Sequence, residues 1–181
     1  MQWLILLWTS ASAPKRFFSW LEPQPPRTFR GGLVAYLSLL ALGLVAAFGL
    51  GRATASDAAL LLVVFAVVGS SALFAWVWAF GSVFVQRPGG LELRAWEVTG
   101  WSWTPALFGV IAMLVPIFVL PAPALIATFV GVLVWHLVTL RAGLAVFLGA
   151  RATRVVTIYT LYIYVLPLAI LGLVVWLALQ I

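Results

Sequence analysis

The sequence contains no cysteine, one histidine and only four acidic residues among 181. Without cysteine the chain can form neither a disulfide nor a thiolate metal site, and a single histidine excludes a multi-histidine metal site within one chain. Charged residues make up 8% of the chain, whereas a soluble domain carries about 25%. So few charges cannot cover a surface that faces water, and 65% of the residues are hydrophobic. These deficits predict an integral membrane protein.

Recognisable catalytic patterns are also missing from the sequence. It has no H-E-x-x-H zinc motif, no phosphate-binding loop and no G-x-S-x-G nucleophile motif. We therefore expect a non-enzymatic protein with no catalytic residue, cofactor or metal site. The formal charge of +6 comes from basic residues at the ends of apolar runs. This placement favours topology-setting contacts with lipid headgroups over nucleic-acid binding.

Five long apolar runs occupy most of the chain after residue 31. They show no alternation of apolar and polar residues of the kind found in membrane strands, so they are expected to be helices. Most approach or exceed the roughly 20 residues that a membrane span needs. We expect these helices at about residues 32–50, 58–85, 104–120, 125–148 and 155–181. The predicted fold is an all-α integral membrane protein, a bundle of five transmembrane helices that forms one domain, residues 32–181.

The stretch that begins at Glu92 is interpreted as a short polar loop that turns back into the bilayer. Trp96, Trp101 and Trp103 are typical of a membrane interface, where one edge of the ring is wet and the other apolar. Pro105 suits the first turn of the helix that follows.

Proline also marks two later positions. Pro121–Ala124 is interpreted as a tight hairpin between the third and fourth runs, and Pro167 is expected to kink the fifth. A turn at Arg151–Arg154 is expected to join the fourth run to the fifth.

Residues 1–31 are expected to form an interfacial amphipathic segment with a proline-rich entry to the first span. The Ala11–Ala13 triplet resembles a signal-peptide cleavage site, but no basic residue precedes it and its apolar core is short. Aromatic residues near Lys15 and Arg16 favour an element that lies in the headgroup plane instead.

The basic residues of the loops predict an orientation. With five spans, one side of the membrane receives only Arg52, and the excess on the other side places the N-terminus in the cytoplasm and the C-terminus outside, in the cytoplasmic (inner) membrane. The basic residues on the predicted cytoplasmic side are Lys15, Arg16, Arg27, Arg30, Arg87, Arg94, Arg151 and Arg154.

Arg141 is the most informative single residue, because it lies inside the fourth apolar run. A charge at the centre of a membrane helix costs about 2.5–3.5 kcal/mol on insertion scales. Arg141 can reduce that cost by extending toward the cytoplasmic surface or by pairing with an acid. We expect a contact with Glu97, or failing that with Glu92, and two roles stay open: a strut that fixes helix register, or an ion or headgroup site.

His136 lies deeper in the same run, about 140° around the helix from Arg141. A neutral imidazole hydrogen-bonded to a neighbouring helix is expected, with Thr157, Thr160 and Tyr164 as candidate partners. A proton relay is the alternative.

Three stretches of the sequence resemble the Yip family, the Ypt/Rab-interacting membrane proteins, in its prokaryotic branch. The first runs from Ser12 to Leu33 and has a basic residue, paired phenylalanines and two proline clusters. The third is the helix-four region around Trp135, Leu140 and Gly143, which is followed by a basic turn. The second carries an acid-Leu pair, a Gly-aromatic-Ser turn and spaced prolines, with tryptophan where a tyrosine is common; its residues are Glu92, Leu93, Gly100, Trp101, Ser102, Pro105 and Pro116.

This resemblance covers almost the whole chain and implies five spans with a cytoplasmic N-terminus. In eukaryotes the family is tied to vesicle traffic and Rab-type GTPases through a long N-terminal region. This sequence offers little of that region, so GTPase binding is not expected.

The sequence thus predicts a membrane scaffold that self-associates and binds lipids or other membrane proteins, with no nucleic acid as partner. The alternative is a channel or carrier for a small ion or lipid, with Glu97, His136 and Arg141 along its path.

Overall fold

The computed structural model describes residues 2–54, 59–84, 91–113 and 122–180. Every regular element in these ranges is helical, which confirms the all-α prediction. Two short elements of other helical types interrupt the C-terminal part, the 3-10 turn η2 and the π-helical segment η3. The elements are α1 (Gln2–Ser12), α2 (Pro14–Leu21), α3 (Thr28–Thr54), α4 (Ala59–Phe84), α5 (Leu91–Trp101), α6 (Thr104–Met113), α7 (Ala122–Leu148), η2 (Gly149–Arg151), α8 (Ala152–Thr160), η3 (Leu161–Val165) and α9 (Leu166–Ala178).

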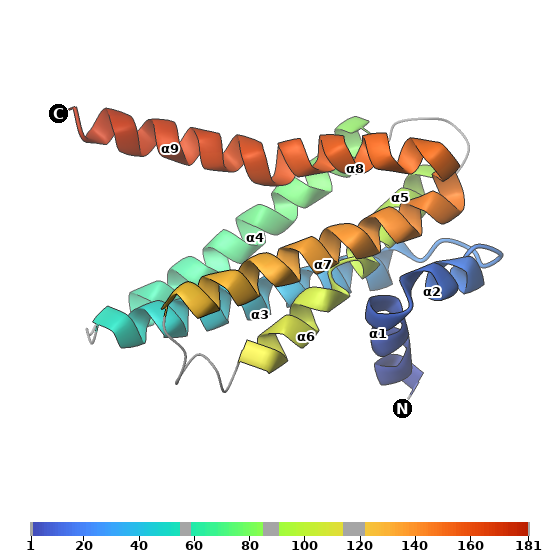
Figure 1. Ribbon diagram of the computed structural model, residues 1–181, viewed down its shortest axis with the longest axis horizontal. Coiled ribbons are helices and arrows are strands. Elements are labelled where there is room, and N and C mark those ends of the chain that lie inside the picture. The colour runs from blue at the N-terminus through green and yellow to red at the C-terminus, as the bar shows by residue number, and fades with distance from the viewer. Residues whose placement is uncertain (1, 55–58, 85–90, 114–121, 181) are drawn as a thin grey trace.

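The long helices run to and fro along the longest axis of the molecule (Figure 1). Helix α3 packs against α4, α5 and α6, and α7 packs against α6, α2 and α8. The short helices α1 and α2 are joined at Ala13 and lie at one end of the bundle, α1 across its long axis and α2 along it; we call them the N-terminal helix pair. At the other end α9 diverges from α3, α4 and α7 and carries the C-terminus.

Helix α5 corrects the prediction of a polar loop after Glu92. The segment LELRAWEVTGW is helical throughout, because it contains good helix formers and no proline. The helix ends at Trp101, and α6 begins at Thr104 with Pro105 in its first turn. The predicted turn is thereby reduced to Ser102 and Trp103.

Two other predicted junctions are displaced. Helix α7 already begins at Ala122, with Pro123 in its first turn, so the part of the expected Pro121–Ala124 hairpin that the structure describes is helical. The turn expected at Arg151–Arg154 lies earlier, at Gly149, whose φ of 54° is a left-handed conformation that suits glycine.

At the kink predicted for Pro167 the helix has a wide, π-helical turn. Proline has no N–H to donate and its ring clashes with the carbonyl one turn earlier. The π-helical segment Leu161–Val165 lies in that preceding turn. The fifth apolar run is therefore divided into α8, η3 and α9.

A cluster of buried aromatic side chains joins the N-terminal helix pair to the bundle. Phe17 and Phe18 of α2 are 2% and 0% exposed. Phe18 fits against α7 at Gly143, where an added Cβ would lie 2.7 Å from its ring. The predicted N-terminal segment is therefore packed on the bundle through its buried side, which lies next to α7.

Many large apolar side chains elsewhere are exposed, as expected of a protein surrounded by lipid. They are most numerous in the projecting α9, including Leu168, Leu173 and Trp176. By length and apolar composition alone, two stretches of the described residues qualify as candidate membrane spans, Thr28–Val45 and Ala127–Ile170. The count of five spans stays a prediction.

Candidate functional site

The short turn between α5 and α6 forms a hydrogen bond with α7. The Ser102 hydroxyl donates to the Thr99 carbonyl and the Thr104 hydroxyl to the Trp101 carbonyl, each at 2.7 Å. The backbone carbonyl of Ser102 is left to face α7, where His136 Nδ1 lies 2.8 Å from it. Because a carbonyl can only accept, Nδ1 carries the hydrogen and donates it.

His136 is completely buried in a group of aromatic rings. Its ring stacks on Trp103 at a centroid distance of 4.1 Å and lies 5.7 Å from Tyr159 and 6.4 Å from Tyr164. Its Nε2 has no hydrogen-bond partner among the described residues. A bond from His136 to a neighbouring element was expected, but the acceptor is the α5–α6 turn and not a hydroxyl of the fifth run. Thr157 and Thr160 instead donate to carbonyls of their own helix.

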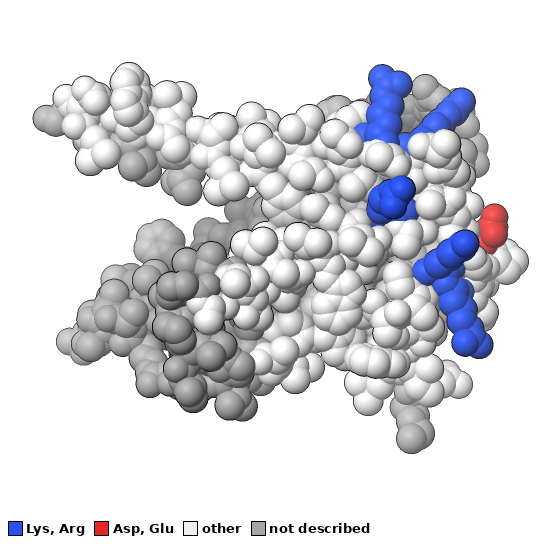
Figure 2. Space-filling view, in the orientation of Figure 1, with Lys and Arg blue, Asp and Glu red and all other residues white. Residues whose placement is uncertain are grey.

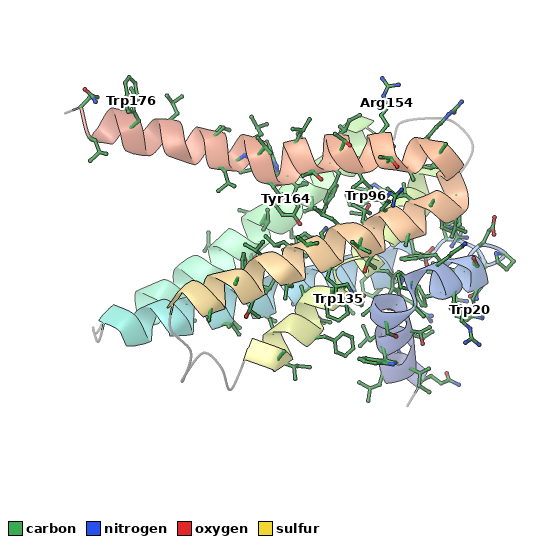
Figure 3. The ribbon with its side chains drawn as sticks, in the orientation of Figure 1. Trp20, Trp96, Trp135, Arg154, Tyr164 and Trp176 are labelled. Atoms are coloured by element: carbon green, nitrogen blue, oxygen red, sulfur yellow. The ribbon has the colours of Figure 1, made fainter. Side chains whose placement is uncertain are left out.

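A groove of about 630 Å³ lies beside this aromatic group. Figure 2 shows the hollow between the projecting α9 and the rest of the bundle. Its lining is almost entirely apolar, and Trp103 and Tyr164 form the part nearest His136. The Tyr164 side chain points from its helix toward α7 (Figure 3), and its hydroxyl is buried without a partner among the described residues. Residues from α3, α4, α7 and α9 complete the lining, among them Leu42, Gly69, Leu73, Leu133 and Leu168.

Small residues bring α3 and α4 together on one side of this groove. An added Cβ at Gly43 would lie 2.5 Å from the Ser70 hydroxyl oxygen, so the two helices meet closely there. Ser70 donates to carbonyls of both helices, to Ala66 at 2.6 Å and to Leu39 at 3.1 Å. Gly69, next to it, faces open space: a Cβ there would meet nothing within 4 Å.

The acid that was expected to pair with Arg141 has another partner. Glu97 Oε2 lies 2.7 Å from Arg94 Nη1, and both side chains are buried. Arg94 also donates to the backbone carbonyl of Gln24, in the segment that leads into α3.

Arg141 lies apart from this pair. Its side chain is exposed, and its Nε donates to the Thr153 hydroxyl at 3.4 Å. The predicted contact between Arg141 and Glu97 is therefore wrong, because Arg94 is on the same helix as Glu97, three residues away, and satisfies the carboxylate first. The side chain of Glu92, the second candidate, lies outside the described residues. The i, i+3 spacing of Arg94 and Glu97 was the signal that could have predicted the pair.

The residues of the Gly-aromatic-Ser turn have distinct structural roles. Gly100 touches α3 at Gly31, where an added Cβ would lie 2.2 Å from the Gly31 backbone. Trp101 is buried against Phe17, with ring centroids 5.0 Å apart. Ser102 supplies the carbonyl that His136 binds, and Pro105 lies in the first turn of α6. Pro116 lies outside the described residues.

The described residues offer no cluster of metal-binding side chains. No three side chains among histidine, cysteine, aspartate and glutamate come together in the part of the chain that the structure describes. The chemistry available in the groove is therefore that of apolar contact with one or two hydrogen-bonding groups.

A family model matches the chain. The model described as the Yip1 domain matches residues 8–177, nearly the whole chain. No curated protein and no solved structure matches the chain.

Proposed function

The chain belongs to the Yip1 domain family, and on that basis we propose that it is a non-enzymatic membrane protein that self-associates and organises the lipids around it. The observation that carries this proposal is the apolar groove of about 630 Å³ beside α9. Its volume lies in the range of small-molecule sites, and its lining suits a hydrocarbon chain. The Tyr164 hydroxyl at its edge suits a single polar group, such as the ester carbonyl of a phospholipid.

Five membrane crossings form part of this proposal. They are α3, α4, α5 continued by α6, α7, and α8 continued by α9, which all run along one axis of the molecule. Basic side chains gather at one end of that axis (Figure 2), as expected for a cytoplasmic end with the N-terminus on that side.

A conduit is the less favoured function, because an ion path needs a continuous polar lining. The three residues suggested for such a path each interact with different groups and do not contact one another in a continuous line. Glu97 is paired with Arg94, His136 is enclosed by aromatic rings, and Arg141 is exposed near Thr153.

Photo-crosslinking tests the proposed lipid groove. The protein is reconstituted with a phospholipid that carries a photoactivatable group on its acyl chain, and the labelled peptides are identified. We expect labelling at Leu73, Leu133 and Leu168, and a loss of several fold in Gly69→Leu, whose side chain would fill the groove. Gly131→Leu is the matched control, since Gly131 also faces open space but does not line the groove.

Two outcomes would contradict the proposal. One is the absence of labelling at the groove; the other is an equal effect of both leucine substitutions. Crosslinking of the protein at low density in the same vesicles tests self-association, which predicts a dimer or larger species. A species that stays monomeric at every density would remove that part of the proposal.

A further inference from the structure

A second cavity lies on the opposite side of α7, at its junction with α2. It has a volume of about 400 Å³ and is lined by Lys15, Val138, Arg141, Ala142, Ala145 and Val146. The five residues from α7 are spaced by one, three or four, so they lie on one stripe of the helix. Lys15 comes from the other wall, on α2. We call this cavity the cationic pocket.

The cationic pocket has two positive charges and, among the residues that the structure describes, no carboxylate in its lining to balance them. In the described part of the chain the one ion pair is that of Arg94 and Glu97, so neither Lys15 nor Arg141 has an acidic partner there. The long contact from Arg141 to Thr153 supplies a hydroxyl but no charge. An anion would therefore complete the site. Exposed basic side chains gather at this same end of the molecule (Figure 2).

One side of the cationic pocket continues into an apolar strip. Val138, Val134 and Val130 follow one another at intervals of one turn along α7, and they are 57%, 54% and 51% exposed. From Arg141 to Val130 the helix rises roughly 16 Å. That length is close to one leaflet of a hydrocarbon core about 30 Å thick. A cation pair thus stands at the end of an exposed apolar strip that is about one leaflet long.

We propose that Lys15 and Arg141 bind the phosphate of an anionic phospholipid whose acyl chain lies along Val138, Val134 and Val130. The planar guanidinium of Arg141 can donate two parallel hydrogen bonds to phosphate oxygens, and Lys15 adds a point charge from α2. This site deepens the proposed lipid-organising function and rests on it, since both require the chain to lie in a bilayer. It is separate from the groove beside α9.

The site depends on the packing of the N-terminal helix pair against α7. The two cations are brought together because Phe18 of α2 packs into the space left by Gly143 of α7. Trp135 Nε1 also donates to the Ala11 carbonyl at 3.0 Å, which ties α7 to the end of α1.

Lipid retention by the full-length protein tests this inference. The protein is purified in detergent with equal amounts of phosphatidylglycerol and phosphatidylcholine, and the bound lipids are counted by native mass spectrometry. We expect phosphatidylglycerol to be retained in preference to phosphatidylcholine. Arg141→Gln and Lys15→Gln should each lower its retention about fivefold, the effect of one lost cation contact, and Arg141→Lys should retain part of it.

Arg154→Gln is the matched control, because it removes the same charge from the same end of the molecule. The Arg154 side chain points away from α7 (Figure 3), so the preference should be unchanged. Lys15 is exposed and its substitution should leave folding intact, which keeps the test valid should Arg141→Gln fold poorly.

Three results would overturn the inference. They are equal retention of the two lipids by the unsubstituted protein, an equal loss in Arg154→Gln and Arg141→Gln, and displacement of the lipid by millimolar inorganic phosphate, which would mark a site for the free ion. Gly69→Leu should leave the headgroup preference unchanged. A failure here that leaves groove labelling intact would therefore overturn this site without touching the proposed function.

Discussion

Arg94 fastens two distant segments of the chain with one guanidinium group. It pairs with Glu97 on its own helix and donates to the Gln24 carbonyl before α3. A buried pair contributes little net stability by itself, yet the loss of one partner leaves an uncompensated buried charge. Sequence reasoning assigned Glu97 to Arg141, because acids are few and Arg141 has a high insertion cost. The local partner prevailed because a residue three positions away needs no tertiary contact to find it.

Arg94→Leu tests the fastening role of this residue. Glu97 would remain buried without its cation, and we expect a loss of about 3–5 kcal/mol in the free energy of unfolding. The measurement is denaturant unfolding in detergent followed by tryptophan fluorescence. The double variant Arg94→Leu/Glu97→Leu, which removes both charges, should recover much of that loss. A single variant that loses under 1 kcal/mol would contradict the role.

At the scale of helices, the bundle depends on a glycine contact between α3 and α5. Gly31 and Gly100 bring the two backbones so close that a Cβ on either would lie within 3 Å of the other helix. Glycine costs a helix roughly 0.5–1 kcal/mol relative to alanine, and at this contact that cost allows the close approach. The contact also positions the Ser102 carbonyl, two residues later, for His136.

Gly100→Ala should therefore destabilise the protein, because the added methyl group meets backbone atoms that cannot rotate away. We expect a loss of about 1–3 kcal/mol or more in the free energy of unfolding. Gly131→Ala, at a helical glycine that faces open space, should be neutral or slightly stabilising. The two variants are compared by thermal unfolding in the same detergent. Equal effects would show that helix propensity, and not the contact, decides.

Buried phenylalanine side chains pack the N-terminal helix pair against the bundle. Phe18→Ala would leave a cavity between α2 and α7 that costs about 3–5 kcal/mol. Since this packing mainly stabilises the contact between the N-terminal helix pair and α7, we expect faster proteolytic cleavage near residues 13–21, with the bundle still folded. Trp20→Ala is the control, because the Trp20 ring is 51% exposed. Equal cleavage rates in the two variants would contradict the docking role of Phe18.

Helices that are long and apolar could be predicted from the sequence, and shorter, more polar ones could not. Helices α4 and α7 lie within a few residues of their predicted bounds, because long apolar runs leave few other conformations in a bilayer. Helix α5 was missed because LELRAWEVTGW is short and half polar. Its residues Arg94, Glu97 and Thr99 are buried, and the contacts of α5 with α3 and α7 are not revealed by any local pattern. The groove beside α9 was not foreseen either, since its lining comes from α3, α4, α7, α9, the π-helical segment η3 and the α5–α6 turn.

At the scale of the molecule, charge and apolar surface are segregated along one axis. Exposed basic side chains lie at the end that carries the N-terminal helix pair, and the exposed apolar surface of α9 extends toward the other end. The orientation predicted from the loops stays a prediction. With five crossings it would place the two termini on opposite sides of the membrane, which labelling of introduced thiols tests.

The absence of cysteine makes that test clean, because any introduced thiol is the only one in the chain. Ser19→Cys lies on the exposed side of α2, and Gln180→Cys lies exposed beyond α9. With a membrane-impermeant maleimide we expect Ser19→Cys to react only in inside-out vesicles and Gln180→Cys only in right-side-out ones. Ala35→Cys, at a position 2% exposed, should react in neither. If both exposed thiols react from the same side, the number of crossings is even, and the proposed topology of five crossings would be wrong.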